Sequence, residues 1–177
     1  MEKPNTILDK KAFVESRSVQ IKAIVDELVF KYNQDLDTYI KNIKEIALPQ
    51  KDRLTDIDIE KMVLKIPIFM YYSANGLEEL GVEQDNAEAI HKELYNEAFQ
   101  DANGTIRDKE AIAESSVMED YMIEQIFRRS YKKLKIKIEM ADKIYSGVKK
   151  ILSKRMSDNE LSKMDGNRGV DPYDDNR

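Results

Sequence analysis

The sequence predicts an all-α protein of long amphipathic helices, a helical bundle with a long, coiled-coil-like C-terminal helix. Charged residues make up 36% of the 177 residues and hydrophobic residues 41%, a mixture that is typical of long helices. Glycine and proline, which interrupt helices, occur only six and four times. Apolar residues recur at steps of three and four along most of the chain, which is the period of a helix face.

The first expected helix runs from about residue 9 to residue 48. It ends there because Pro49 pushes the residue before it out of the α region. A second helix begins after Thr55, because Thr55 and Asp58 match a capping box with Asp in the place of Glu. These local signals place the first two helices and the turn between them.

Two breaks are expected in the middle of the chain. Pro67 is expected to kink the second helix, and the pair Asn75-Gly76 to bend or end it. A third, shorter helix is then expected over residues 83–99, before "QDANGT" interrupts the chain.

Beyond this break the sequence predicts one very long helix. Thr105 and Asp108 form a second start signal, and no glycine or proline follows before Gly147. We therefore expect a helix over residues 106–156, about 75 Å long at roughly 1.5 Å per residue. Its apolar residues alternate steps of four and three, which is the pattern of a coiled-coil seam. We expect this seam to join copies of the chain in a homo-oligomer, through Phe127, Tyr131, Leu134, Ile138, Ala141, Tyr145, Val148 and Leu152.

Positive charge is concentrated in one block of an otherwise acidic chain. Residues 1–126 carry a net charge of −11, residues 127–156 one of +9, and residues 157–177 one of −3. This division predicts an acidic helical region over 1–105, a long basic helix over 106–156 and a flexible acidic tail over 157–177.

The densest part of the block is "RRSYKKLKIK", residues 128–137. Its cations wrap most of the polar circumference of the expected helix, and along that helix only Glu139 and Asp142 are placed to offset them. Such a cluster is typical of proteins that hold a phosphate backbone through counterion release. Our candidates for phosphate contacts are Arg128, Arg129, Lys132, Lys133, Lys135 and Lys137.

A second interpretation of the cluster stays open. Acidic helices from residues 1–126 can pack against it and neutralise it, through exposed ion pairs worth about 0–1 kcal/mol each. The wrapped placement favours an exposed surface, because a partner helix neutralises only the flank that it touches. Tyr131 also has two roles open, stacking on a base or packing in the seam, and its register favours the seam.

Little in the sequence indicates catalysis, so we expect a protein that is not an enzyme. His91 is the only histidine and there is no cysteine, which argues against a metal site of the usual kind. We interpret His91 as a surface or packing residue. No Walker-type or dinucleotide-binding glycine motif occurs. We therefore expect no catalytic residue, no metal ion and no cofactor.

The sequence also bears on compartment. No apolar run approaches the length of a membrane span, and the N-terminal residues lack the hydrophobic stretch of a signal peptide. The absence of cysteine fits a reducing compartment. We expect a protein without membrane contact in the cytoplasm, which is the host cytoplasm if the chain is phage-encoded.

Two stretches are similar to a known family. The segment "IFMYYSANG" and the run over residues 118–155, which includes "YKKLKIKIEMADKIYSGVKKILSKR", resemble the UvsY-type recombination mediators of tailed bacteriophages. The resemblance implies an all-helical protein that assembles into a ring through its C-terminal helices. It further implies binding to single-stranded DNA and help in loading a recombinase in place of the single-strand-binding protein.

Two functions are therefore carried forward. The leading hypothesis is a homo-oligomeric accessory protein that binds single-stranded DNA, with a recombinase and a single-strand-binding protein as partners. The rival is a structural or scaffolding phage protein, or an inhibitor that binds another protein, which assembles through the C-terminal helix.

Overall fold

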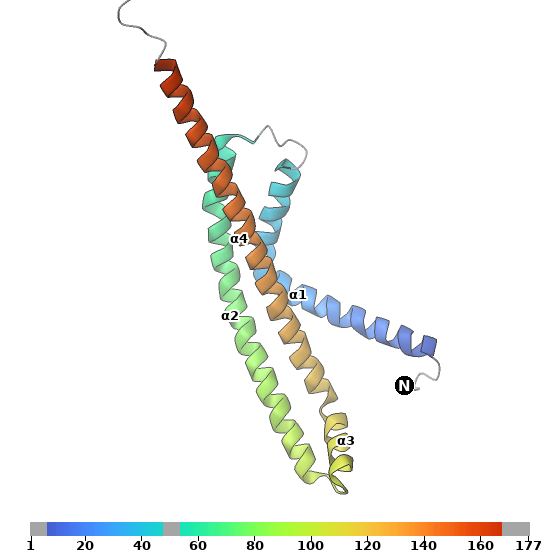
Figure 1. Ribbon diagram of the computed structural model, residues 1–177. Helices are drawn as coiled ribbons and strands as arrows, with labels where there is room; N and C mark the ends of the chain where they lie inside the picture. The colour runs from blue at the N-terminus through green and yellow to red at the C-terminus, as the bar shows by residue number, and fades with distance from the viewer. Residues whose placement is uncertain (1–6, 48–53, 168–177) are drawn as a thin grey trace, which may run out of the picture. The chain divides into compact units, whose positions relative to one another are not determined.

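A computed structural model describes the backbone of residues 7–47 and 54–167, and the side chains of residues 15–47 and 54–163. The described chain is all-α, as the composition and periodicity predict (Figure 1). The helices are α1 (Ile7–Ala47), α2 (Asp56–Asp101), α3 (Ile106–Ser116) and α4 (Met118–Asn167).

The chain forms two compact units, and α1, α2 and α4 each contribute a segment to both. Unit 1 combines Met1–Asp35 with Tyr71–Ile138, and so includes α3. Unit 2 combines Leu36–Met70 with Glu139–Arg177.

The core of unit 1 lies where segments of α1, α2 and α4 meet. Val25 and Val29 of α1 pack with Leu80 of α2 and Leu134 of α4. Leu134 has no exposed surface, and full burial of such a side chain stabilises the fold by about 1.5–3 kcal/mol.

Unit 2 has a core of its own. Ile59, Met62 and Ile66 of α2 pack with Val148 of α4, and half-buried residues such as Tyr39 of α1 surround them. The three buried α2 residues recur at steps of three and four, so one face of that helix segment supplies most of this core.

Both predicted capping boxes are confirmed. The Thr55 hydroxyl accepts from the Asp58 N–H at 3.2 Å, while the Asp58 carboxylate accepts from the Thr55 N–H at the same distance. Thr105 and Asp108 form the same reciprocal pair at the start of α3. These side chains satisfy backbone donors that have no partner within the helix.

The expected break at Asn75-Gly76 is wrong, because α2 continues through it to Asp101 and includes the segment predicted as a third helix. Gly76 is buried, and a Cβ atom there would lie 2.4 Å from Cβ of Tyr32. Glycine is therefore present for the close approach of α1 and not for a turn. Pro67 lies inside α2, where it removes one backbone donor.

The prediction of a single helix over 106–156 is also wrong, because a separate helix, α3, precedes α4 and because α4 ends later than predicted. Helix α3 ends at Ser116, and Val117 separates it from α4 although no glycine or proline is present. Hydrogen bonds from the Val117 N–H to Ala113 and from the Tyr121 N–H to Val117 still span the break. Helix α4 then continues past Met156, so residues 157–167 of the predicted tail are helical, and residues 168–177 lie outside the described residues.

Candidate nucleic-acid interface

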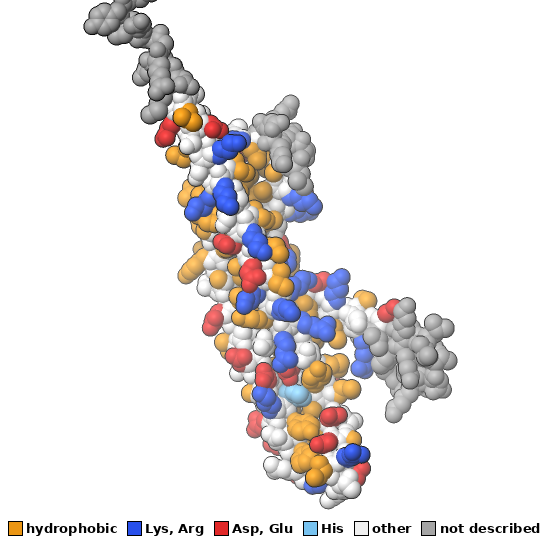
Figure 2. All heavy atoms as spheres, viewed as in Figure 1, with side chains coloured by type: hydrophobic (Ala, Val, Ile, Leu, Met, Phe, Trp, Pro, Cys, Tyr) orange, Lys and Arg blue, Asp and Glu red, His pale blue; other side chains and the backbone are white. Residues whose placement is uncertain are grey.

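The six candidate phosphate contacts lie on one stretch of α4 in unit 1. Arg and Lys are good helix formers, and Tyr131 and Leu134 anchor this stretch in the core. The cations occupy six of the other eight positions, and Figure 2 shows Lys and Arg side chains gathered along the middle of α4. The six differ in whether an acidic side chain lies close to them.

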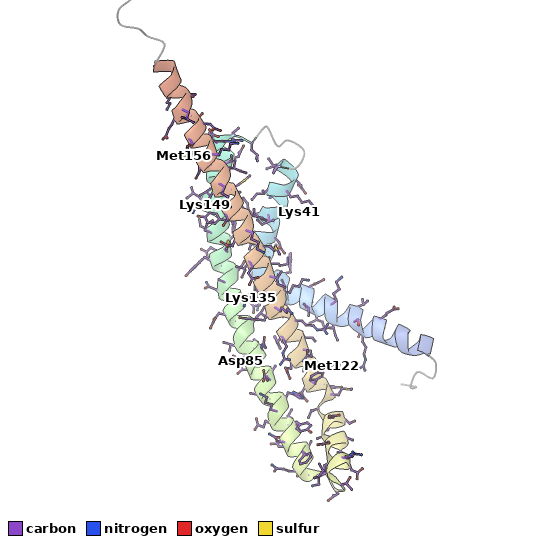
Figure 3. The ribbon with its side chains drawn as sticks, in the orientation of Figure 1. Lys41, Asp85, Met122, Lys135, Lys149 and Met156 are labelled. Carbon is purple, nitrogen blue, oxygen red and sulfur yellow. The ribbon has the colours of Figure 1, made fainter. Side chains whose placement is uncertain are left out.

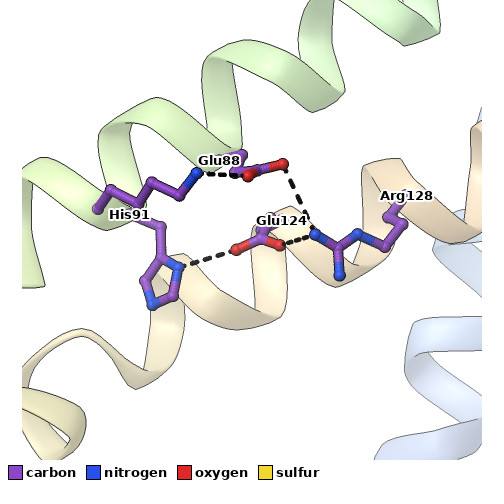
Figure 4. Close-up of polar contacts among 5 residues, drawn as sticks. Glu88, His91, Glu124 and Arg128 are labelled. Carbon is purple, nitrogen blue, oxygen red and sulfur yellow. Dashed lines mark hydrogen bonds and ion pairs between the residues drawn. The ribbon is translucent and has the colours of Figure 1, made fainter.

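Arg128 belongs to the paired group. Its guanidinium donates to Glu124 at 2.6 Å and lies 3.7 Å from Glu88 of α2 (Figure 4). Glu124 is four residues before Arg128 on the same helix, which is a favourable spacing for an ion pair. The expectation that only Glu139 and Asp142 offset the block along α4 is therefore wrong. The four-residue spacing of Glu124 and Arg128 is visible in the sequence and could have identified this ion pair.

The carboxylate of Glu124 joins Arg128 to His91. Its second oxygen lies 2.8 Å from the His91 Nδ1, and the Glu124 side chain is only 5% exposed. Glu88 in turn accepts from Lys92 at 2.6 Å. The pKa of Glu88 is lowered, first by this hydrogen bond from Lys92 and further by the nearby positive charges. The interpretation of His91 as a packing residue agrees with these contacts, but the sequence did not indicate its partner.

Lys133 is also paired, with Asp26 of α1. Its hydrogen bond is the largest cause of a lowered pKa at Asp26, and the charges of Lys22 and Lys137 act in the same direction. Lys137 is half-buried. On this flank the acidic part of the chain does neutralise the block, as the second interpretation predicted.

The other three cations face solvent. Arg129, Lys132 and Lys135 are all exposed, and Figure 3 labels Lys135 on α4. Within the described part of the chain, no ion pair or hydrogen bond involves any of the three. One flank of the block is thus neutralised, as the second interpretation predicted, and these three cations on the other side have no acidic partner among the described residues.

Unit 2 carries a second basic group on its own segment of α4. Lys149 and Lys150, with Ser146 and Ser153, line a shallow depression, and Lys149 also lies 5.3 Å from the centre of the Tyr145 ring. Arg155 has a structural role instead, because it donates to the Leu54 carbonyl at 2.7 Å and to Asp56 at 2.8 Å.

The predicted oligomer seam is buried within one chain. Phe127, Tyr131, Leu134 and Ile138 belong to the core of unit 1. In unit 2, Tyr145, Val148 and Leu152 pack in the core, and Ala141 is 2% exposed. The pattern was identified correctly, and within the described chain its residues pack against the chain's own α1 and α2. Tyr131 is accordingly a core residue.

Over the described residues, no helix is both long and apolar enough to cross a membrane. In the same part of the chain, no group of three or more His, Asp or Glu side chains is arranged to hold a metal ion. No protein family, curated protein or solved structure matches the chain.

Proposed function

We propose that this chain binds single-stranded DNA through Arg129, Lys132 and Lys135, and that it acts as a recombination accessory protein. The observation that carries the proposal is the exposure of these three cations next to three others that have local acidic neighbours. A cation whose charge is already neutralised contributes little to a polyanion, whereas an exposed one releases counterions when a phosphate binds.

The spacing of the three cations favours a single strand over a duplex. A step of three residues along an α-helix places the next side chain about 60° around the helix axis from the one before. Arg129, Lys132 and Lys135 therefore form a row that winds around α4 over a rise of about 9 Å. A flexible single strand can follow such a path. Duplex DNA is stiff over about 150 base pairs, and bending it sharply around one helix costs several kcal/mol.

The finer role, loading a recombinase in place of a single-strand-binding protein, rests on the resemblance to UvsY-type mediators. That resemblance covers residues 118–155, which include Arg129, Lys132 and Lys135, together with the "IFMYYSANG" stretch of α2. Ring assembly, which it also implies, would have to use surface that the packing of α4 against α1 and α2 leaves exposed.

The test of DNA binding is a titration of a labelled mixed-sequence 30-nucleotide strand at low and moderate salt. We expect tight binding at low salt. The logarithm of the affinity should fall linearly with the logarithm of the salt concentration, with a slope of about −0.7 per phosphate contact. Matched duplex should bind more weakly under the same conditions. Absence of strand binding at low salt would contradict the proposal.

A second candidate is a protein-binding or scaffolding role, favoured by an exposed apolar face. On α2 in unit 2, Ile57, Leu64 and Ile68 are 62%, 68% and 51% exposed and share one side of the helix. Contiguous exposed apolar residues often mark protein interaction sites. This candidate predicts self-association or partner binding that Leu64→Glu abolishes and that neutral substitutions in the basic cluster leave unchanged.

A further inference from the structure

A cavity of about 410 Å³ lies in unit 1 beside the break between α3 and α4. Cavities of this size are in the range that holds small aromatic ligands. Residues from α2, from α3, from the break itself and from α4 line it: His91, Tyr95, Glu114, Val117, Met118 and Tyr121.

The lining combines aromatic faces with one free carboxylate. The rings of His91 and Tyr121 lie 5.5 Å apart between centroids, and Tyr121 is 48% exposed. Tyr95 adds a third ring, and Met118 a polarizable thioether. The Glu114 side chain is exposed, and among the described residues it has no ion pair or hydrogen bond.

The cavity is also adjacent to the basic cluster. His91 lines it and is held at 2.8 Å by Glu124, and the other oxygen of Glu124 holds Arg128 at 2.6 Å (Figure 4). A single carboxylate therefore separates the cavity wall from the first cation of the cluster. Tyr121 of the cavity wall lies eight residues before Arg129 on α4, about 12 Å along the helix axis, so a strand that contacts Arg129 is within reach of the cavity.

We propose that this cavity receives one base of the bound strand, and that it prefers a base with an exocyclic amino group. The base would stack on Tyr121 or Tyr95, as bases stack on aromatic side chains in many single-strand-binding proteins. The Glu114 carboxylate accepts hydrogen bonds and cannot donate one when ionised, so it pairs with the amino group of cytosine or adenine. The amino group of guanine meets the same requirement. Thymine has no amino group, and its one donor on this edge, N3–H, lies between two carbonyl oxygens that repel the carboxylate, so its contact is weaker.

This inference rests on the proposed binding of single-stranded DNA, and a pair of photoreactive strands tests it. Each strand carries one halogenated pyrimidine at the same position, either 5-iodocytosine, which keeps the amino group, or 5-iodouracil, which lacks it. After irradiation with the full-length protein, peptide mass spectrometry identifies the crosslinked residues. We expect crosslinks at Tyr121 or Tyr95, several-fold more abundant for 5-iodocytosine.

Matched variants separate recognition from general effects. Glu114→Gln should bring the crosslinking ratio of the two bases close to one, whereas Glu110→Gln, one turn earlier on the same exposed helix, should leave the ratio unchanged. Tyr121→Leu should weaken strand binding about fivefold or more, which corresponds to the loss of one stacked base. Tyr71→Leu, at a similarly exposed tyrosine outside the cavity, should not.

The outcomes distinguish the two proposals. Strand binding with crosslinks elsewhere, or with equal yields for both bases in the unmodified protein, would overturn the base-binding cavity and leave DNA binding intact. Failure of both strands to bind at low salt would overturn both proposals together. Circular dichroism of each variant shows that a loss of crosslinking does not come from unfolding.

Discussion

The backbone of Gly76 in α2 lies so close to Tyr32 in α1 that a Cβ atom on Gly76 would meet Cβ of Tyr32 at 2.4 Å. Alanine normally stabilises a helix interior by about 1 kcal/mol relative to glycine. Here the contact involves the stem of Tyr32, which cannot rotate away, so overpacking at about 1–3 kcal/mol outweighs that gain. We expect Gly76→Ala to lower the free energy of unfolding in urea.

Gly147 of α4 provides the matched control. It is exposed, and a Cβ atom there would meet nothing within 4 Å. Gly147→Ala should therefore raise the free energy of unfolding by up to about 1 kcal/mol. Stabilisation by both substitutions would contradict the close contact between Gly76 of α2 and Tyr32 of α1.

Leu134→Ala tests whether the seam is an internal core. Leu134 has no exposed surface and packs against Val25, Val29 and Leu80 of the same chain. Truncation should cost about 2–5 kcal/mol of stability. The unfolding midpoint should also be independent of protein concentration in both proteins. A midpoint that rises with concentration in the unmodified protein but not in Leu134→Ala would indicate that the seam joins copies of the chain.

Arg128 and Arg129 are neighbours with different surroundings, so the same substitution should affect them differently. Arg128→Gln leaves the buried Glu124 carboxylate with His91 as its remaining partner, and we expect a loss of about 1–3 kcal/mol in stability. Arg129→Gln should change stability by less than about 0.5 kcal/mol, as at ordinary surface positions. Thermal unfolding of the two variants, measured side by side, tests this difference. Equal losses of stability would contradict the pairing of Arg128 with Glu124.

Acid should weaken the start of α3. The hydroxyl and the N–H of Thr105 donate to Asp108, and these hydrogen bonds lower the pKa of Asp108 from its ordinary value of 3.8. A pKa that is lower in the folded state gives a stabilisation that is complete above about pH 4 and is lost as the pH falls through the folded-state pKa. The melting temperature should fall below that pH, and Asp108→Asn should flatten the fall. Glu110→Gln, on the same helix, should leave it unchanged.

The capping boxes were predictable because each depends on residues three positions apart. Thr55 with Asp58 and Thr105 with Asp108 form their hydrogen bonds within the first turn of one helix, and no residue of another helix takes part in them. The meaning of Gly76 was not predictable in this way, because it depends on Tyr32 in another helix. The seam was likewise identified from its period, but the period carries no information on whether its partner is the same chain or a copy.

The same distinction between local signals and contacts between helices applies to the candidate site. The basic cluster over residues 128–137 was predictable from composition and spacing, and the placement of its cations around the helix favoured an exposed surface. The pairing of Lys133 with Asp26 joins two helices and leaves no local signal, whereas the pairing of Arg128 with Glu124 could be found from its four-residue spacing. The cavity beside Val117 depends on a helix break that neither glycine nor proline marks.

The most direct test of the account compares strand binding by two triple variants over a range of salt. One replaces Arg129, Lys132 and Lys135 by Gln, and the control replaces Lys41, Lys44 and Arg107, which are equally exposed cations outside the cluster. Both remove three positive charges. We predict that the first variant binds the strand more weakly, with a salt slope shallower by about 2, and that the control keeps the original slope. Equal binding by the two variants would contradict the assignment of these three residues as the nucleic-acid interface.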